Sequence, residues 1–173
     1  MNINALRRLA GCIAYLLIGA VSLKAQQPVF PPAAYNSPVI NYIRTWVATA
    51  PVTDPNALLT KTLKDVKQTT QYLDGLGRPI QVVAKQASQE TGSVATDLVS
   101  PVVYDEFGRE TYKYLPFVAN NTGGNSSINN GYFKLNPFQQ QETFMQGQYG
   151  PQGETFFYSK TNFESSPLSR VEK

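Results

Sequence analysis

The stretch Tyr104–Glu110 reads YDEFGRE, and 31 residues earlier Leu73–Pro79 reads LDGLGRP. Aligned on the acid, both stretches contain the pattern Asp-x-x-Gly-Arg. A short chain that repeats a five-residue pattern is either built from repeated hairpins or uses the acids for chemistry. The residues that carry the pattern are Asp74, Gly77 and Arg78 in the first copy and Tyr104, Asp105, Gly108 and Arg109 in the second.

The pattern predicts a β-hairpin turn. An aspartate at the first position of a type I turn accepts a hydrogen bond from a nearby backbone N–H. A glycine three residues later adopts the left-handed conformation without a steric penalty and forms the bulge of a hairpin. The arginine then enters the return strand, from which it can reach an aspartate of its own hairpin or of an adjacent one. We therefore interpret the pattern as a structural turn motif, whose repetition would build a continuous β-ribbon.

The segments around the two turns have the composition of strands. β-Branched and aromatic residues predict one hairpin from 69–73 and 79–84 and another from 102–104 and 109–117, with Tyr112 and Tyr114 on one face. Further strands are expected at 39–49 and 155–159, and a polar loop at 120–131. Asp54-Pro55 predicts a short helix of one to three turns, with an apolar face made by Leu58, Leu59, Leu63 and Val66. The predicted fold class is all-β, a hairpin-rich ribbon or sheet with at most one short helix.

The first 25 residues predict a secretory signal peptide. Arg7 and Arg8 precede an apolar run at 9–23, which is too short to span a bilayer comfortably. Cleavage is expected after Ala25, with Ser22 as the other candidate, and an uncleaved membrane anchor is the alternative. Residues 9–12 spell a lipobox, but it precedes the apolar run, so acylation at Cys12 is not expected. The predicted organisation is a signal peptide at 1–25, a proline-rich leader at 26–38 and a β-rich domain at 39–173.

Charge and cysteine content change when the signal is removed. Three of the 15 basic residues and no acidic residue lie in 1–25, so the remaining 12 basic residues balance the 12 acidic ones. We therefore expect no nucleic-acid partner and no stable membrane span in the mature chain. Cys12 is the single cysteine, so an exported mature chain would contain no disulfide.

The sequence predicts no enzyme, no cofactor and no metal site. It contains no histidine, which removes histidine-based triads and imidazole metal sites. Paired carboxylates remain possible in principle, but Asp105 and Glu106 are adjacent and would point to opposite faces of a strand. A calcium site lacks the expected alternating aspartates. Trp46, Tyr112 and Tyr114 are expected to pack in the core rather than to form a sugar platform.

At these residues the chain resembles a known family. YDEFGRE resembles the Tyr-Asp-x-x-Gly-Arg repeat of bacterial Rhs (rearrangement hotspot) proteins. LDGLGRP, preceded by Gln71-Tyr72, resembles the signature of DUF6443, a domain of unknown function that precedes Rhs repeats in some exported proteins. NYIRTW near Asn41 and the closing FESSPLSRV stand in the expected order, so the resemblance covers roughly 35–173. The first copy departs from the repeat in having Leu73 in place of the tyrosine.

The resemblance implies a structural role. Rhs repeats form a large β-ribbon that spirals into a hollow shell, which often encloses a C-terminal toxin. We expect this chain to be an exported, non-enzymatic segment that starts or caps such a shell, located at the cell surface, in the periplasm or outside the cell. Its main partner would be the downstream shell of the same polypeptide.

Two alternatives remain open at the level of sequence. A stand-alone surface module that binds a glycan or a protein is the second hypothesis, and a carboxylate-pair enzyme is the third. Repeat units generally need about three copies to be stable, and the only further candidate is a degenerate copy at Phe163-Glu164 and Arg170. The chain is therefore expected to be a piece of a longer protein, with a compact stand-alone β domain as the alternative.

Overall fold

The computed structural model describes residues 32–36, 40–88 and 94–172. The predicted signal peptide, the predicted cleavage sites and most of the predicted leader lie outside these ranges. Within them, antiparallel strands dominate and a single α-helix is present, so the predicted all-β class with one short helix is confirmed. No described helix is long and apolar enough to cross a membrane.

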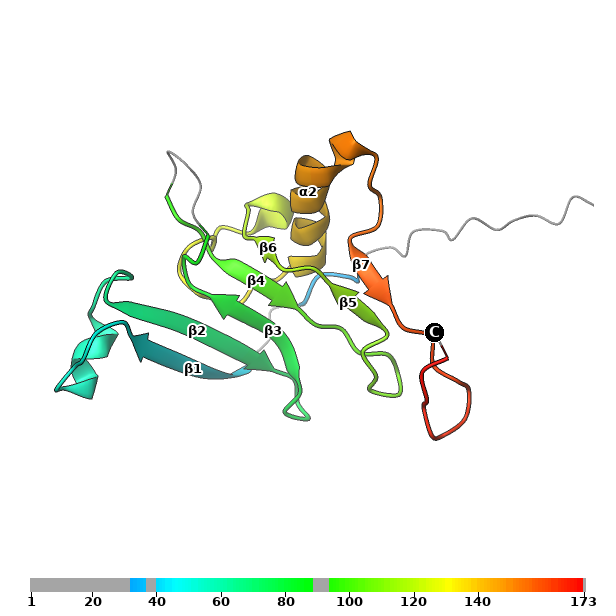
Figure 1. The fold of residues 1–173 in the computed structure, drawn as a ribbon, viewed down its shortest axis with the longest axis horizontal. Coiled ribbons are helices and arrows are strands. Elements are labelled where there is room, and N and C mark those ends of the chain that lie inside the picture. The colour runs from blue at the N-terminus through cyan, green and yellow to red at the C-terminus, as the bar shows by residue number, and fades with distance from the viewer. Residues whose placement is uncertain (1–31, 37–39, 89–93, 173) are drawn as a thin grey trace, which may run out of the picture.

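Five strands form the main antiparallel sheet, in the order β1-β2-β3-β4-β6 (Figure 1). The predicted strand at 39–49 and the predicted first hairpin are both present, as β1 and as β2 with β3. A separate two-stranded sheet pairs β5 with β7. The strand bounds are Asn41–Ala48 for β1, Val66–Leu73 for β2, Pro79–Ala84 for β3, Leu98–Pro101 for β4, Tyr112–Tyr114 for β5, Phe117–Val118 for β6 and Tyr158–Lys160 for β7.

A row of opposed residues across the main sheet forms its centre. Thr70 pairs with Val83, Val83 with Val99, and Val99 with Phe117, and all four side chains are fully buried. Opposed residues in antiparallel strands lie on the same face. The hydrophobic core extends from this row to residues of the helix and of the segment before β7, and its members are Tyr72, Val83, Val99, Phe117, Ala119, Met145 and Phe157.

The helix α2 spans Pro137–Tyr149 and packs against β4 and β6, with Phe138 and Met145 buried (Figure 1). This helix was not predicted from the sequence. Its buried face also contains Gln140 and Gln141, so the apolar periodicity that identifies an amphipathic helix is interrupted. The Gln141 side chain donates a 2.9 Å hydrogen bond to the backbone carbonyl of Phe157, which fixes the chain just before β7.

The predicted second hairpin is wrong in its return strand. The segment 109–117 was expected to be one strand, but it divides into β5 and the start of β6 on either side of Leu115-Pro116. Proline has no N–H for a ladder, so the strand is interrupted there. A single bridge joins Val102 to Lys113, after which β5 pairs with β7 and β6 returns to β4. The turn itself is formed, but the two sides diverge into different sheets.

The predicted helix near Asp54 is a short 3-10 helix, Pro55–Leu59, capped by the Asp54 carboxylate, which accepts from the Asn56 N–H. Its predicted apolar face is wrong, because Val66 begins β2 and Leu59 is exposed. The loop 120–131 is present and contains a second 3-10 turn at Thr122–Gly124. The strand predicted at 155–159 is displaced to Tyr158–Lys160 and preceded by a third 3-10 turn, Gly150–Gln152.

A buried ion pair holds the long loop on the sheet. Lys134 Nζ lies 2.7 Å from Asp97 Oδ2, and both side chains are fully buried. Asp97 also accepts from the backbone N–H groups of Gln86 and Gly131. The Gln81 side chain donates to the Lys134 carbonyl and accepts from its N–H. Burial lowers the pKa of Lys134. The hydrogen bond from Gln86 joins the two ends of the connection between β3 and β4, whereas the others link the loop or the residues after it to β3 or to Asp97, just before β4.

Removing either member of this pair is expected to destabilise the fold strongly. A buried charge left without its partner costs on the order of 3–5 kcal/mol. Asp97→Ala should cost more than Lys134→Met, because it also leaves the Gln86 and Gly131 N–H groups without an acceptor. Urea unfolding of the two variants measures the difference. Equal losses, or a loss below about 1 kcal/mol for both, would contradict this assignment.

Candidate functional site

The two predicted turns have the same local geometry. In motif 1, Asp74–Arg78, the Asp74 carboxylate accepts from the N–H groups of Leu76 and Arg78 at 2.9 and 2.8 Å. The Asp74 carbonyl accepts from the N–H of Gly77, whose φ is +80°. The Arg78 guanidinium returns to the carboxylate of its own turn, with Nε and Nη2 each 2.8 Å from Asp74 Oδ2. The Asp74 carboxylate therefore binds both the backbone N–H groups of its turn and the side chain of Arg78.

Motif 2, Asp105–Arg109, repeats these contacts. Asp105 Oδ1 accepts from the N–H groups of Phe107 and Arg109, and Arg109 Nε lies 2.8 Å from Asp105 Oδ2. Gly108 has a φ of +77°. The Thr111 hydroxyl donates a further hydrogen bond to Asp105 Oδ2. These contacts, led by the Arg109 backbone N–H, lower the pKa of Asp105 to about 2.

A third motif, Glu164–Arg170, is built on the degenerate sequence FESSPLSR. Here the acid is two residues further from the arginine, and a glutamate spans the extra length. Glu164 Oε1 accepts from the Arg170 backbone N–H at 3.1 Å and from Arg170 Nε at 3.0 Å. The residue before the arginine is Ser169, which has a φ of +49° where the other two turns have glycine. Hydrogen bonds from Ser166 and Arg170 lower the pKa of Glu164.

Each of the first two arginines also stacks on the aromatic residue before the next acid. The Arg78 guanidinium carbon lies 4.3 Å from the ring centroid of Tyr104, which precedes Asp105. The Arg109 guanidinium carbon lies 4.9 Å from the ring centroid of Phe163, which precedes Glu164. A guanidinium within about 6 Å of a ring centroid forms a cation–π contact. Motif 1 is thus linked to motif 2, and motif 2 to motif 3, by the same kind of contact, although Arg109 also lies 4.9 Å from the ring centroid of Phe107 in its own turn. We call this series the arginine ladder.

The first step of the ladder has an additional contact. The Tyr104 hydroxyl donates a 2.9 Å hydrogen bond to the carbonyl of Pro79, the residue after Arg78. Burial raises the pKa of Tyr104. Gly108 lies so close to this step that an added Cβ would be 2.6 Å from Arg78 Nη1, whereas an added Cβ on Gly77 would meet nothing within 4 Å. A side chain at Gly108 would therefore displace the end of the Arg78 side chain, in addition to the cost of its backbone conformation.

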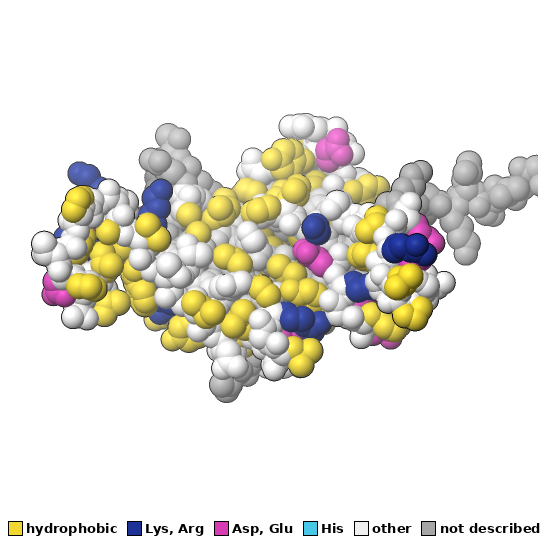
Figure 2. Space-filling model, turned by 60° about the horizontal axis from the view of Figure 1, so that its bottom comes forward, with side chains coloured by type: hydrophobic (Ala, Val, Ile, Leu, Met, Phe, Trp, Pro, Cys, Tyr) yellow, Lys and Arg dark blue, Asp and Glu magenta, His cyan; other side chains and the backbone are white. Residues whose placement is uncertain are grey.

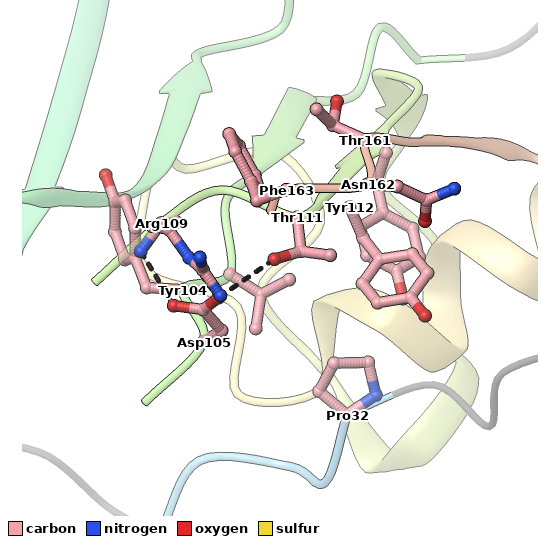
Figure 3. A pocket seen from close by; sticks show the side chains of 11 residues that line it. Pro32, Tyr104, Asp105, Arg109, Thr111, Tyr112, Thr161, Asn162 and Phe163 are labelled. Atoms are coloured by element: carbon pink, nitrogen blue, oxygen red, sulfur yellow. Dashed lines mark hydrogen bonds and ion pairs between the residues drawn. The ribbon is translucent and has the colours of Figure 1, made fainter. Parts of the chain in front are cut away.

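A pocket of about 490 Å³ lies beside motif 2 (Figure 3). In Figure 3, Arg109 and Thr111 both reach Asp105, while Tyr112 stands on the other side of the pocket and Pro32 lies at its edge. Tyr112 and Tyr114 share one face of β5, as predicted, and both pack edge-on or tilted against Tyr158. The full lining is Pro32, Val103, Tyr104, Asp105, Arg109, Thr111, Tyr112, Tyr114, Thr161, Asn162 and Phe163.

The other predicted candidates lie elsewhere. Trp46 is half-buried on β1, an edge strand, rather than in the core cluster. Tyr114 packs on Phe138 of α2 with ring centroids 4.9 Å apart, and burial is the main cause that raises its pKa to about 12.

Among the described residues, no group of three or more Cys, Asp, Glu or His side chains could hold a metal ion.

A comparison with family models gives one match. The model of the domain of unknown function DUF6443 covers residues 44–173, which is most of the chain. The chain belongs to the DUF6443 family. No curated protein and no solved structure matches it. The family match includes all three turn motifs of this DUF6443 domain, together with most of β1 and the whole of α2.

A matched pair of glycine substitutions tests the arginine ladder in the DUF6443 domain. Gly77→Ala should cost only the left-handed backbone penalty, about 1 kcal/mol. Gly108→Ala should cost about 1 kcal/mol more, because it also displaces the Arg78 guanidinium from the Tyr104 ring. Urea unfolding measures both losses. In an Arg78→Ala background the excess should vanish, and an excess that persists there would show that Gly108 acts without the ladder.

Proposed function

We propose that this DUF6443 domain is an exported, non-enzymatic structural segment that starts or caps the β-shell of an Rhs/YD-repeat protein. In Rhs proteins this shell often encloses a C-terminal toxin. The observation that carries the proposal is the arginine ladder. Two turns of one type and a longer variant of it are joined in series by the same arginine-on-ring contact. A contact that repeats from each motif to the next is suited to a ribbon that grows by adding hairpins.

The chemistry of the acids agrees with a structural role. The carboxylates of Asp74, Asp105 and Glu164 each accept backbone and guanidinium hydrogen bonds from their own turn. The pKa of each is lowered by these hydrogen bonds. A general acid needs the opposite shift, toward the working pH. We therefore assign these carboxylates to the closure of turns, and we assign no catalytic residue, cofactor or metal ligand.

The charges on the surface do not favour a polyanionic partner. On the face shown in Figure 2, the basic and acidic side chains are scattered, and apolar side chains occur along the whole length. Nucleic-acid binding depends on a concentrated basic patch. Together with the equal numbers of acidic and basic residues after position 25, this supports a protein partner, the downstream shell of the same polypeptide.

A surface module that binds a glycan or protein is the second candidate, and the pocket beside motif 2 favours it. Its wall combines tyrosine rings with polar groups from Thr111, Thr161 and Asn162. Such a mixture of flat apolar and hydrogen-bonding surfaces is typical of small-ligand sites. On this hypothesis Tyr112→Ala would abolish glycan binding while the domain still folds.

Fractionation of native cells distinguishes the two candidates. An immunoblot with an antibody against residues 26–173 should detect a band far heavier than 19.1 kDa, outside the cytoplasm. A variant with Leu16→Arg and Leu17→Arg disrupts the apolar run of the predicted signal and should keep the product in the cytoplasm. An exported band near the mass of the mature chain would overturn the shell role and favour the binding module. A cytoplasmic native product would overturn both.

A further inference from the structure

The arginine ladder has an open position at its third motif. Arg78 lies over Tyr104 and Arg109 over Phe163. No ring of the residues that the structure describes lies over Arg170. The side chain of Arg170 is 71% exposed, against 35% for Arg78 and 25% for Arg109.

The exposure of Arg170 does not come from a poorly formed turn. The partner acids of the three arginines are covered to the same extent, with side chains 20%, 22% and 19% exposed for Asp74, Asp105 and Glu164. Arg170 Nε is held by Glu164 Oε1 at 3.0 Å, as in the other motifs. The edge of the guanidinium is therefore fixed, while its face is uncovered.

The apolar residues around the motifs locate the open surface more closely. The residue just before the left-handed position is exposed in all three turns, at 79% for Leu76, 72% for Phe107 and 70% for Leu168. Its exposure is thus a common property and does not indicate a missing partner. The residue after the arginine differs, because Val171 is 63% exposed whereas Pro79 and Glu110 are partly buried. The uncovered surface consists of the Arg170 face and Val171.

We infer that this surface docks a fourth hairpin of the same type, supplied by the same polypeptide and carrying an aromatic residue directly before its acid. Both occupied steps of the ladder take their ring from an aromatic-acid dipeptide, Tyr104-Asp105 and Phe163-Glu164. The incoming ring would lie over the Arg170 guanidinium and cover Val171, while its own acid closes its own turn. The source of this hairpin, although not the chemistry of the docking, rests on the proposed shell function.

An extended chain tests the docking at high effective concentration. A copy of residues 98–114 is placed after Lys173 on a flexible Gly-Ser linker, which makes the encounter intramolecular. Cysteines at the copies of Val102 and Lys113, which lie opposite each other, close the appended hairpin as a disulfide. The matched control carries leucine in place of the tyrosine that copies Tyr104. Both proteins are also made with Arg170→Lys, which keeps the charge and removes the planar face.

The readouts are the Arg170 Nε–Hε signal in the NMR spectrum and the urea midpoint of unfolding. The tyrosine extension should shift the Arg170 signal upfield by the ring current and raise the midpoint above that of the leucine extension. The signals of Arg78 and Arg109, whose faces are occupied, should not move. With Arg170→Lys the two extensions should unfold at the same midpoint.

Two results would overturn the inference. Identical Arg170 signals and midpoints for the tyrosine and leucine extensions would show that the surface does not select a ring. A concentration-dependent upfield shift in the unextended chain, with dimers in sedimentation, would assign the surface to a second copy instead. The shell function fails separately, through the immunoblot, because a short native product would leave the response of Arg170 to the tyrosine extension unchanged.

Discussion

The Arg78 guanidinium makes the contact on which the arrangement of the turns depends. One edge of its plane is held by Asp74 of its own turn, and its face lies 4.3 Å from the centroid of Tyr104 in the next motif. An arginine can make both contacts because its charge is spread over a rigid plane with several N–H donors, whereas a lysine ammonium is a point charge. The local turn thereby acquires a long-range partner, and a Cβ at Gly108 would displace the Arg78 guanidinium from its present position.

The molecule combines two different ways of fixing a chain. The main sheet, α2 and the long loop are fixed by burial, through the row from Thr70 to Phe117 and the ion pair of Lys134 with Asp97. Beyond the main sheet, the paired strands β5 and β7 are only three residues long, and the arginine ladder connects motifs 2 and 3 to motif 1 at the end of β2 and β3. A unit held together by burial makes all its contacts internally, whereas the arginine ladder leaves the face of its last guanidinium, that of Arg170, uncovered. On the proposed function, this difference would let a folded domain begin a ribbon while one guanidinium face stays uncovered for the next hairpin.

The parts that could be predicted from the sequence are the local ones. The turns of motifs 1 and 2 are specified within five residues, because the acid, the glycine and the arginine each have a fixed place in the turn. The partners of the arginines could not be predicted, since Arg109 and Phe163 lie far apart in sequence and meet only through the fold. A signal existed in the aromatic residues before the acids of motifs 2 and 3, Tyr104 and Phe163, but their role became visible only from the structure.

Three other features were hidden for physical reasons. The helix α2 buries Gln140 and Gln141 through hydrogen bonds to backbone carbonyls, so its sequence lacks an apolar stripe. The return strand predicted for the second hairpin is interrupted at Pro116, because proline has no N–H to donate to a neighbouring strand. Lys134 and Asp97 are charged residues of the kind normally assigned to the surface, and they meet only because the segment around Lys134 folds back onto the sheet.

A double-mutant cycle on Arg78 and Tyr104 tests the central claim most directly. Arg78→Lys and Tyr104→Leu are made singly and together, and their free energies of unfolding are measured in urea. Tyr104→Phe, which retains the ring and loses the hydrogen bond to Pro79, serves as the control. The arginine ladder predicts a coupling energy of about 1 kcal/mol with leucine, most of it retained with phenylalanine. Losses that add to within about 0.3 kcal/mol would contradict it, because the two turns would then be independent neighbours.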